Sequence, residues 1–365
     1  MSATPRDHRW AHAVGRTDAG PNGRTDGTDT VTHSIVINGS HTELGRRVAQ
    51  LMRDDSTVTT CGVDSPSSHN AAKSVAAAHT LIVLAPGSDT ERDGSSVGGV
   101  DVALAERLLH LADAGHLRQV VLLSSAMVYG AWPDNPVPIT EDQAVRPNPG
   151  SSFACDKAEL ERVVTEWCEH HPGVRLAVLR PTLVVSEEPE AVEWMERSLW
   201  HTASARFGDV DPPRQFLLLD DLARAIDHVR RKELDGVYNV APDGWLAVAP
   251  QIELTGRPAT TSVRVPEALA EGVAETRWKL QLTSTPPDVL PFTMYPWVVS
   301  SDRLRATGWH PGSSNEEAFV AGHRERWWAS LSARRRQEIA LGAMVGGIVV
   351  AGGATYALVR RLLRS

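Results

Sequence analysis

The chain of 365 residues contains little cysteine, lysine or tyrosine. Its 3 cysteines form no CxxC pair, which argues against a disulfide framework and a structural zinc site and fits a reducing compartment. Basic residues are not in excess either, because 37 Lys and Arg stand against 45 Asp and Glu, for a net charge of -8. Proteins that bind DNA or RNA usually carry a basic excess, so we expect no nucleic-acid partner.

Several catalytic and metal-binding motifs are missing. The chain has no HExxH sequence, and its HxxxH pair, His8 and His12, lies in a polar N-terminal segment, so we expect no metal site. The pair Ser124 and Ser125 is not flanked by the glycines of a GxSxG sequence, so it is not a serine-hydrolase nucleophile turn. The 42% hydrophobic and 22% charged residues are nevertheless ordinary for a globular protein.

The two ends of the chain differ from its middle. Residues 1–32 are rich in Gly, Asp, Arg and Thr without an apolar period, which predicts a disordered tail. Residues 339–359 (IALGAMVGGIVVAGGATYALV) carry no charge and are long enough to span a bilayer. We expect a single transmembrane helix there, after a basic linker at 326–338. A helix buried at the end of a soluble domain is the alternative, although such a helix normally shows a polar face.

Short β-branched runs alternate with helical patterns through the middle of the chain. The run at 34–37, the turn NGSHTELG at 38–45 and the helical pattern at 46–52 form the strand–turn–helix context of a dinucleotide site. Further strands are predicted at 58–63, 80–84, 119–123 and 174–179, and further helices at 102–114 and 152–170. This alternation predicts an α/β fold with a doubly wound parallel sheet.

A series of segments, in order along the chain, resembles the extended short-chain dehydrogenase/reductase family, which includes nucleotide-sugar epimerases and dehydratases. NGSHTELG stands where the family has TGxxGxxG, SSAMVYG at 124–130 resembles its strand-end motif, and FACDKAELE at 153–161 resembles its YxxxK helix. The later segments are PITEDQAVRPNP, LRPTLVV, FLLLDDLA, GVYNVA and SDRLRATGW. The resemblance implies an NAD(P)-binding Rossmann domain at 33–180 and a small C-terminal substrate lobe with returning core elements at 181–325.

The resemblance also implies where the cofactor binds. Gly39 would form the tight turn and Gly45 would allow close packing of helix on strand, whereas Thr42 replaces the middle glycine and is expected to weaken pyrophosphate binding. Asp64 follows the second predicted strand, where a carboxylate can bind the adenosine ribose and favours NAD, with NADP as the alternative. Ala85, after the third predicted strand, completes the candidate set.

The catalytic positions carry a second departure from the family. Ser125 would orient the substrate oxygen and Lys157 would hold the nicotinamide ribose, but Phe153 stands where the family has its proton-carrying tyrosine. No tyrosine of this chain has a lysine four residues later. Losing a positioned acid–base group typically costs about 10²–10⁴ in rate. Cys155 and Asp156 are weak substitutes. Other routes are Ser125 with an ordered water, or a proton that comes from the substrate or from another loop.

Two functional hypotheses therefore stay open. The first is an NAD(P)-dependent epimerase or dehydrogenase with impaired or altered proton transfer, whose small-molecule substrate is a nucleotide sugar or a membrane-borne isoprenoid or sterol-like compound. The second is a catalytically silent dinucleotide-binding module for redox sensing or scaffolding. A nucleotide site without a signal peptide predicts the cytoplasmic face of the cell membrane, with a single-pass C-terminal anchor. The resemblance further implies a homodimer.

Overall fold

The computed structural model describes residues 33–53, 58–63, 69–85, 100–112, 116–188, 212–247, 266–280 and 286–322. All of these ranges belong to one compact unit of the chain. Within them, no helix has the length and apolar character needed to cross a membrane. The predicted tail at 1–32, the basic linker at 326–338 and the apolar run at 339–359 lie outside the described residues.

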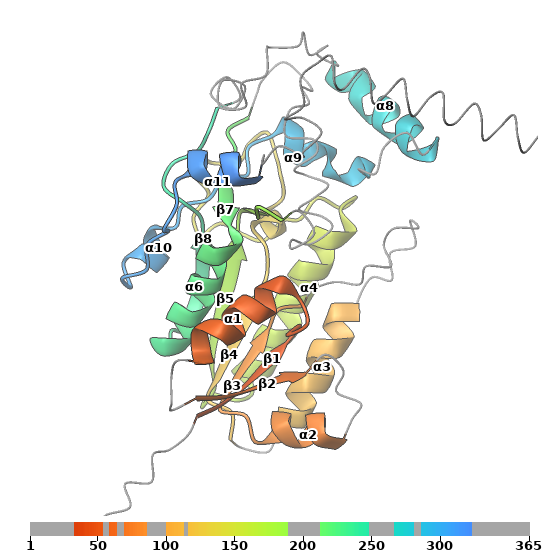
Figure 1. Ribbon diagram of the computed structural model, residues 1–365. Coiled ribbons are helices and arrows are strands. Elements are labelled where there is room, and N and C mark those ends of the chain that lie inside the picture. Colours follow the sequence, from red (N-terminus) through yellow and green to blue (C-terminus); the bar gives the residue numbers. More distant parts are fainter. Residues whose placement is uncertain are drawn as a thin grey trace, which may run out of the picture. The chain divides into compact units, whose positions relative to one another are not determined.

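A six-stranded parallel sheet lies at the centre of this unit (Figure 1). Its strands are β1 (His33–Asn38), β2 (Val58–Val63), β3 (Thr80–Val83), β4 (Gln119–Leu123), β5 (Arg175–Pro181) and β8 (Gly236–Val240). They lie in the order β2-β1-β3-β4-β5-β8, and every neighbouring pair is parallel. The predicted α/β class with a doubly wound parallel sheet is therefore confirmed. The chain moves outward from β1 to β2 and then returns to the other side of β1, which creates a topological switch point between β1 and β3.

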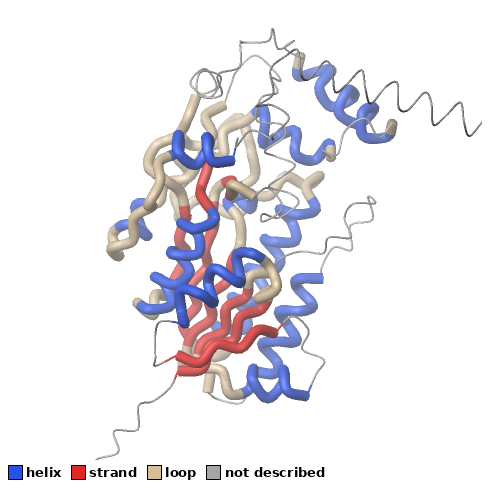
Figure 2. Tube along the Cα trace, in the orientation of Figure 1, coloured by secondary structure: helices blue, strands red, loops and turns tan. Residues whose placement is uncertain are grey.

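Helices cover both faces of the sheet because alternate strand residues point to opposite sides. Ile35 and Ile37 of β1 belong to the core shared with α1 (Glu43–Arg53) and α6 (Leu219–Arg231). Val36, between them, belongs to the core on the other face. That core is closed by α2 (His69–Ala76), α3 (Val100–Ala112) and α4 (Ser152–Glu169). Figure 2 shows the helices in layers against the strands.

A smaller set of elements packs beyond the carboxyl ends of the strands. It contains the parallel pair β6 (Leu183–Val185) and β7 (Phe216–Leu218), the helices α8 (Glu267–Lys279), α9 (Leu290–Met294) and α11 (Asn315–Gly322), and a 3-10 turn η4 (Pro287–Val289). The short helix α10 (Asp302–Arg305) lies beside β8 instead, and its Leu304 belongs to the core on the α1 and α6 face of the sheet. Phe216, Phe292 and Trp297 form the core of the smaller set together with Met127 and Tyr129. The last two residues belong to a 3-10 turn, η2 (Ala126–Tyr129), directly after β4. The smaller core is therefore continuous with the loop that carries SSAMVYG.

Candidate functional site

The carboxyl ends of three neighbouring strands carry candidate residues. Gly39 follows β1, Ala85 lies two residues after the end of β3, and Ser125 lies two residues after the end of β4. Because adjacent strands lie about 4.8 Å apart, this parallel order brings the three positions to one edge of the sheet. The edge includes the switch point between β1 and β3, where open α/β sheets bind their ligands.

The turn between β1 and α1 has a tight glycine geometry. Gly39 adopts a φ of 80°, a conformation that side chains rarely allow. A side chain at Gly45 would overlap the carbonyl oxygen of Gly39, so helix α1 approaches the strand end closely. The N-terminus of α1 therefore lies against the edge of the sheet, where its amide groups and dipole favour an anion.

Thr42 has a specific role in this turn. Its Oγ1 donates to the carbonyl oxygen of Gly39 at 2.7 Å and accepts from the backbone N–H of Gly45 at 3.0 Å. Thr42 is thus the N-cap of α1, because its hydroxyl binds an N–H of the first helical turn. The N–H of Gly45 is thereby engaged within the turn itself.

Charged side chains surround the start of α1. Arg46 and Arg47 both form hydrogen bonds with the carboxylate of Glu43, and Arg47 also pairs with Asp220 of α6. The hydrogen bonds from the two arginines hold the pKa of the Glu43 carboxyl below its ordinary value. The turn therefore carries one ionised carboxylate and two guanidinium groups. The Arg46 side chain is 63% exposed, so it can reach an anion in solvent.

Two serine hydroxyls lie at the end of β4. The Oγ of Ser125 accepts the backbone N–H of Met127 at 3.2 Å and so caps η2, which leaves its own hydrogen available to a substrate oxygen. The neighbouring Ser124 is 3% exposed, and its Oγ has no hydrogen-bond partner among the described residues. Buried hydroxyls normally have a partner, so an orphaned one at this edge fits a site that a polar ligand group completes.

Lys157 is a buried cation at the same edge. Its side chain is 4% exposed, and its Nζ donates to the carbonyl oxygen of Ala85 at 2.6 Å. The Nζ also lies 3.5 Å from Oδ2 of Asp101 and 5.4 Å from the ring centroid of Phe153. Ala85 has a φ of 45°, a conformation that costs free energy for a residue with a side chain and that clusters at functional sites. Lys157 therefore links α4, the start of α3 and the chain after β3.

Two other side chains that could carry a proton, Tyr129 and Cys155, are already engaged in hydrogen bonds. The Tyr129 hydroxyl is buried between Arg180 and Asn239, and burial raises its pKa above the ordinary value. The Cys155 thiol donates to the carbonyl oxygen of Asn148 at 3.7 Å, and partial burial also raises its pKa. Both groups stay protonated and engaged, so neither replaces the phenol that Phe153 lacks.

A buried polar network holds the loop that carries Ser125. Arg180 of β5 donates to both carboxylate oxygens of Glu161 on α4, at 2.9 and 2.5 Å, and to the Tyr129 hydroxyl at 2.8 Å. The Tyr129 hydroxyl donates to Oδ1 of Asn239 at 2.9 Å, and the backbone N–H of Asn239 donates to Glu141 at 2.9 Å. One network therefore joins the loop after β4 to β5, α4 and β8.

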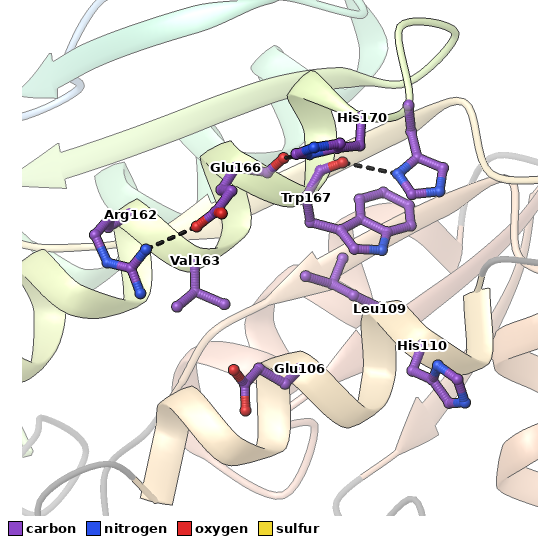
Figure 3. Close-up of a pocket in the computed structure, with 9 residues that line it drawn as sticks. Glu106, Leu109, His110, Arg162, Val163, Glu166, Trp167 and His170 are labelled. Atoms are coloured by element: carbon purple, nitrogen blue, oxygen red, sulfur yellow. Dashed lines mark hydrogen bonds and ion pairs between the residues drawn. The ribbon is translucent and has the colours of Figure 1, made fainter.

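A separate hollow lies between α3 and α4 (Figure 3). It has a volume of about 480 Å³ and is lined by charged and aromatic side chains, among them Glu106, Arg162 and Trp167. Arg162 pairs with Glu166 at 2.7 Å, and the His171 ring stacks on Trp167 at 3.8 Å. Arg162, Glu166 and Trp167 lie in the second half of α4, beyond Lys157, so the hollow is distinct from the predicted cofactor site.

The structure brings together only some of the residues that the sequence predicts for this site. The structure brings Gly39, Thr42 and Gly45 together in one turn and brings Lys157 onto Ala85. Asp64 lies outside the described residues, so its role stays a prediction. The sequence analysis missed Asp101. Its only local signal is that of an acidic residue in the first turn of a helix, which is common without function.

The fold and the site define a dinucleotide-binding class of protein, with a parallel sheet, a glycine turn at the switch point and a helix N-terminus over it. Residues 30–241 match the model of the NAD dependent epimerase/dehydratase family. This match covers more than half of the chain, and the protein belongs to that family.

Relatives and solved structures support the same fold. Uncharacterized proteins of Mycobacterium tuberculosis and Mycobacterium bovis are 25% identical over 244 residues, which cover 66% of this chain and 64% of the relatives' own length. UDP-glucose 4-epimerase of Thermus thermophilus in complex with NAD has a TM-score of 0.56 at 17% identity, over 79% of this chain and 97% of that chain. The fold is also similar to that of UDP-glucuronic acid 4-epimerase from Bacillus cereus, in a tyrosine-to-phenylalanine variant with NAD and a fluorinated UDP-sugar bound. The TM-score is 0.55 at 14% identity, over 79% of this chain and 97% of that chain.

Proposed function

We propose that this protein is an NAD(P)-binding oxidoreductase of the epimerase or dehydratase type, whose substrate is a nucleotide sugar or a membrane-borne isoprenoid or sterol-like compound. The observation that carries the proposal is the meeting of a glycine turn, Ser125 and a buried Lys157 at the carboxyl edge of one parallel sheet. The two epimerases of similar fold described above are named for UDP-sugars, which favours the nucleotide sugar.

Different residues of the chain would bind different parts of the cofactor and the substrate. The turn at Gly39 and the N-terminus of α1 would bind the pyrophosphate, and Asp64 would bind the adenosine ribose. Lys157 would hold the nicotinamide ribose beside Ala85, where its ammonium already lies. The nicotinamide, when bound, would accept or return a hydride. Ser125 would donate its hydroxyl hydrogen to the substrate oxygen and hold it in place.

Proton transfer is the step that differs from the family pattern. Phe153 carries no exchangeable proton, Tyr129 is buried and hydrogen-bonded, and the partly buried Cys155 thiol is hydrogen-bonded as well. We infer that the proton moves through an ordered water at Ser125 or is supplied by the substrate. The Bacillus cereus variant, in which a tyrosine has been replaced by phenylalanine, still holds NAD and a UDP-sugar analogue, and such binding is what we propose for this protein.

A catalytically silent dinucleotide-binding module is the second candidate. Two observations favour it: Phe153 at the tyrosine position, and the Thr42 hydroxyl that occupies the N–H of Gly45. In this function the protein would report the redox state of the cofactor or hold a partner at the membrane. The apolar run at 339–359 would be its anchor on the cytoplasmic face of the cell membrane, as it would be for the enzyme.

We also propose a homodimer that forms through the exposed sides of α3 and α4. The hollow between these helices presents the exposed Glu106 and His110 of α3 beside Trp167 of α4, a surface that a two-fold related copy can cover. Sedimentation analysis of the full-length chain in detergent tests this, since a monomer at micromolar concentration contradicts it.

Calorimetric titration tests the proposed function. The full-length chain, purified in a mild detergent, is titrated with NAD⁺, NADH, NADP⁺ and NADPH, and Lys157→Ala and Lys73→Ala are titrated in parallel. Lys73 is an exposed residue of α2 and is the matched control. We expect micromolar binding that Lys157→Ala weakens by about tenfold or more and Lys73→Ala leaves unchanged.

The outcomes separate the candidate functions. If none of the four dinucleotides binds, the oxidoreductase and the dinucleotide-sensing module are both refuted. If a dinucleotide binds, the loaded protein is incubated with UDP-glucose, UDP-galactose and UDP-glucuronic acid, and reduced cofactor is followed by fluorescence with product analysis by chromatography. Product from any of them supports the enzyme, whereas binding without turnover of these three favours the silent module or the membrane-borne substrate.

A further inference from the structure

Lys157 is buried in a way that requires compensation of its charge. Its side chain is 4% exposed, and an ammonium taken out of water is strongly unfavourable unless it is paired and hydrogen-bonded. The carbonyl oxygen of Ala85 supplies a hydrogen bond at 2.6 Å, and the Phe153 ring, 5.4 Å away, supplies a weak cation–π contact. Neither of these neighbours carries a negative charge.

Asp101 supplies that charge from a different element. Its Oδ2 lies 3.5 Å from the Lys157 Nζ, and its side chain is 14% exposed, so the attraction is only partly screened by water. Asp101 lies in the first turn of α3, where the helix dipole stabilises a carboxylate. The same helix packs against α4 in the core on that face of the sheet. The carboxylate is therefore held at a defined place beside the lysine.

The pair of contacts also sets the direction of the ammonium. Lys157 donates toward Ala85 after β3 and faces Asp101 on α3, so its long side chain is held at two points. A lysine held at one point would keep more of its rotamer freedom and lose it on binding a ligand. In the family pattern a tyrosine stands beside the lysine, and here that position is Phe153.

We propose that Asp101 is a positioning residue that keeps Lys157 charged and aimed at the carboxyl edge of the sheet, so that the lysine binds the nicotinamide ribose in a site without the tyrosine. This inference rests on the proposed function. In this proposal Asp101 affects the nicotinamide half of the cofactor only through Lys157 and does not touch the cofactor itself. Asp101 should then matter for a complete dinucleotide and be irrelevant to a ligand that ends at the pyrophosphate.

A comparison of two ligands tests whether Asp101 affects only the nicotinamide half of the cofactor. NAD⁺ contains the nicotinamide ribose, whereas ADP contains only the adenosine diphosphate half. Both are titrated by calorimetry into the full-length wild-type chain, Asp101→Asn, Asp101→Glu, Lys157→Met and the double variant Asp101→Asn/Lys157→Met. Glu159→Gln is the matched control, because Glu159 is an exposed carboxylate of α4 that pairs with Arg162 instead.

We expect Asp101→Asn to weaken NAD⁺ binding by about tenfold and to leave ADP binding unchanged. Asp101→Glu, which keeps the charge, should recover most of the NAD⁺ affinity. The double variant should bind NAD⁺ no more weakly than Lys157→Met alone, since a residue that acts through another has no effect once that residue is gone. Glu159→Gln should bind both ligands like the wild type.

Other results overturn the inference. Wild-type NAD⁺ affinity in Asp101→Asn refutes it while the proposed function stands, provided that Lys157→Met has lost affinity. Equal loss of NAD⁺ and ADP binding, or additive losses in the double variant, shows a structural role for Asp101 and also refutes it. If wild type binds neither ligand, the proposed function and the inference fail together. If Asp101→Asn does not melt cooperatively, Asp101→Ser serves as the second charge-free variant.

Discussion

Replacing Arg180 by methionine would leave a carboxylate buried without its partner. Arg180 is 5% exposed and donates to both oxygens of Glu161, which is 7% exposed. It also donates to the Tyr129 hydroxyl. Methionine has a similar length and no charge, so the variant Arg180→Met removes these donors without leaving a large cavity.

The size of the effect follows from this burial. Removing one partner of a buried ion pair typically costs about 3–5 kcal/mol, because the remaining charge is uncompensated. Loss of the bond to Tyr129 adds about 1 kcal/mol. We therefore expect Arg180→Met to lower the free energy of unfolding by about 5 kcal/mol, a large fraction of the roughly 5–15 kcal/mol typical of a folded protein. The double variant Arg180→Met/Glu161→Leu should recover about half of this loss, because no buried charge remains.

Urea denaturation followed by tryptophan fluorescence measures these differences. Arg162→Met is the control, because Arg162 pairs with Glu159 and Glu166 at an exposed position where ion pairs contribute less than about 1 kcal/mol. A loss in Arg180→Met that is no larger than in Arg162→Met would refute the reasoning. So would a double variant less stable than Arg180→Met.

Three further predictions concern the turn, the tyrosine position and His79, which directly precedes β3. Thr42→Gly should release the N–H of Gly45 and strengthen NAD⁺ binding roughly three- to tenfold by calorimetry, while costing only a few tenths of a kcal/mol of stability as an N-cap change. The phenol introduced by Phe153→Tyr should ionise below the ordinary pKa of about 10 in an ultraviolet difference titration against wild type, because the Lys157 ammonium lies 5.4 Å from the ring centroid. Burial lowers the pKa of His79, so the unfolded chain binds a proton that the folded chain resists, and the free energy of unfolding should fall as the pH drops below about 6.5. Urea titrations at several pH values measure that slope, which should be smaller in His79→Gln.

The sheet could be predicted from the sequence because its signals are local. Residues 58–63 and 119–123 were predicted as strands and are β2 and β4, since runs of apolar and β-branched residues suit buried strands wherever they are placed. The helix predicted at 152–170 is α4, which ends one residue earlier, at Glu169, because His170 is its C-cap. Helix ends depend on capping and on the chain that enters the helix, so an apolar period locates them less well than it locates the centre.

The candidate site was only partly predictable, because local residue patterns do not show which side chains meet in the folded protein. The spacing of the glycines at 39 and 45 predicts a turn. The capping hydrogen bonds of Thr42, in contrast, depend on the conformation of that turn. A Thr directly before a helix is a capping signal that the sequence analysis did not use. Lys157 was chosen by its place in a motif, and the motif contains no information about what faces its ammonium.

By itself the sequence determined the alternation of strands and helices, the glycine turn, the presence of Ser125 and Lys157 and the absence of a tyrosine at position 153. Each of these depends on residue type or on neighbours within a few positions. Only the tertiary structure decided that Asp101 meets Lys157 and that Arg180 joins Tyr129 to Glu161. Those contacts join separate helices and strands, and their partners meet only when the parallel order of the sheet stacks the helices on its faces.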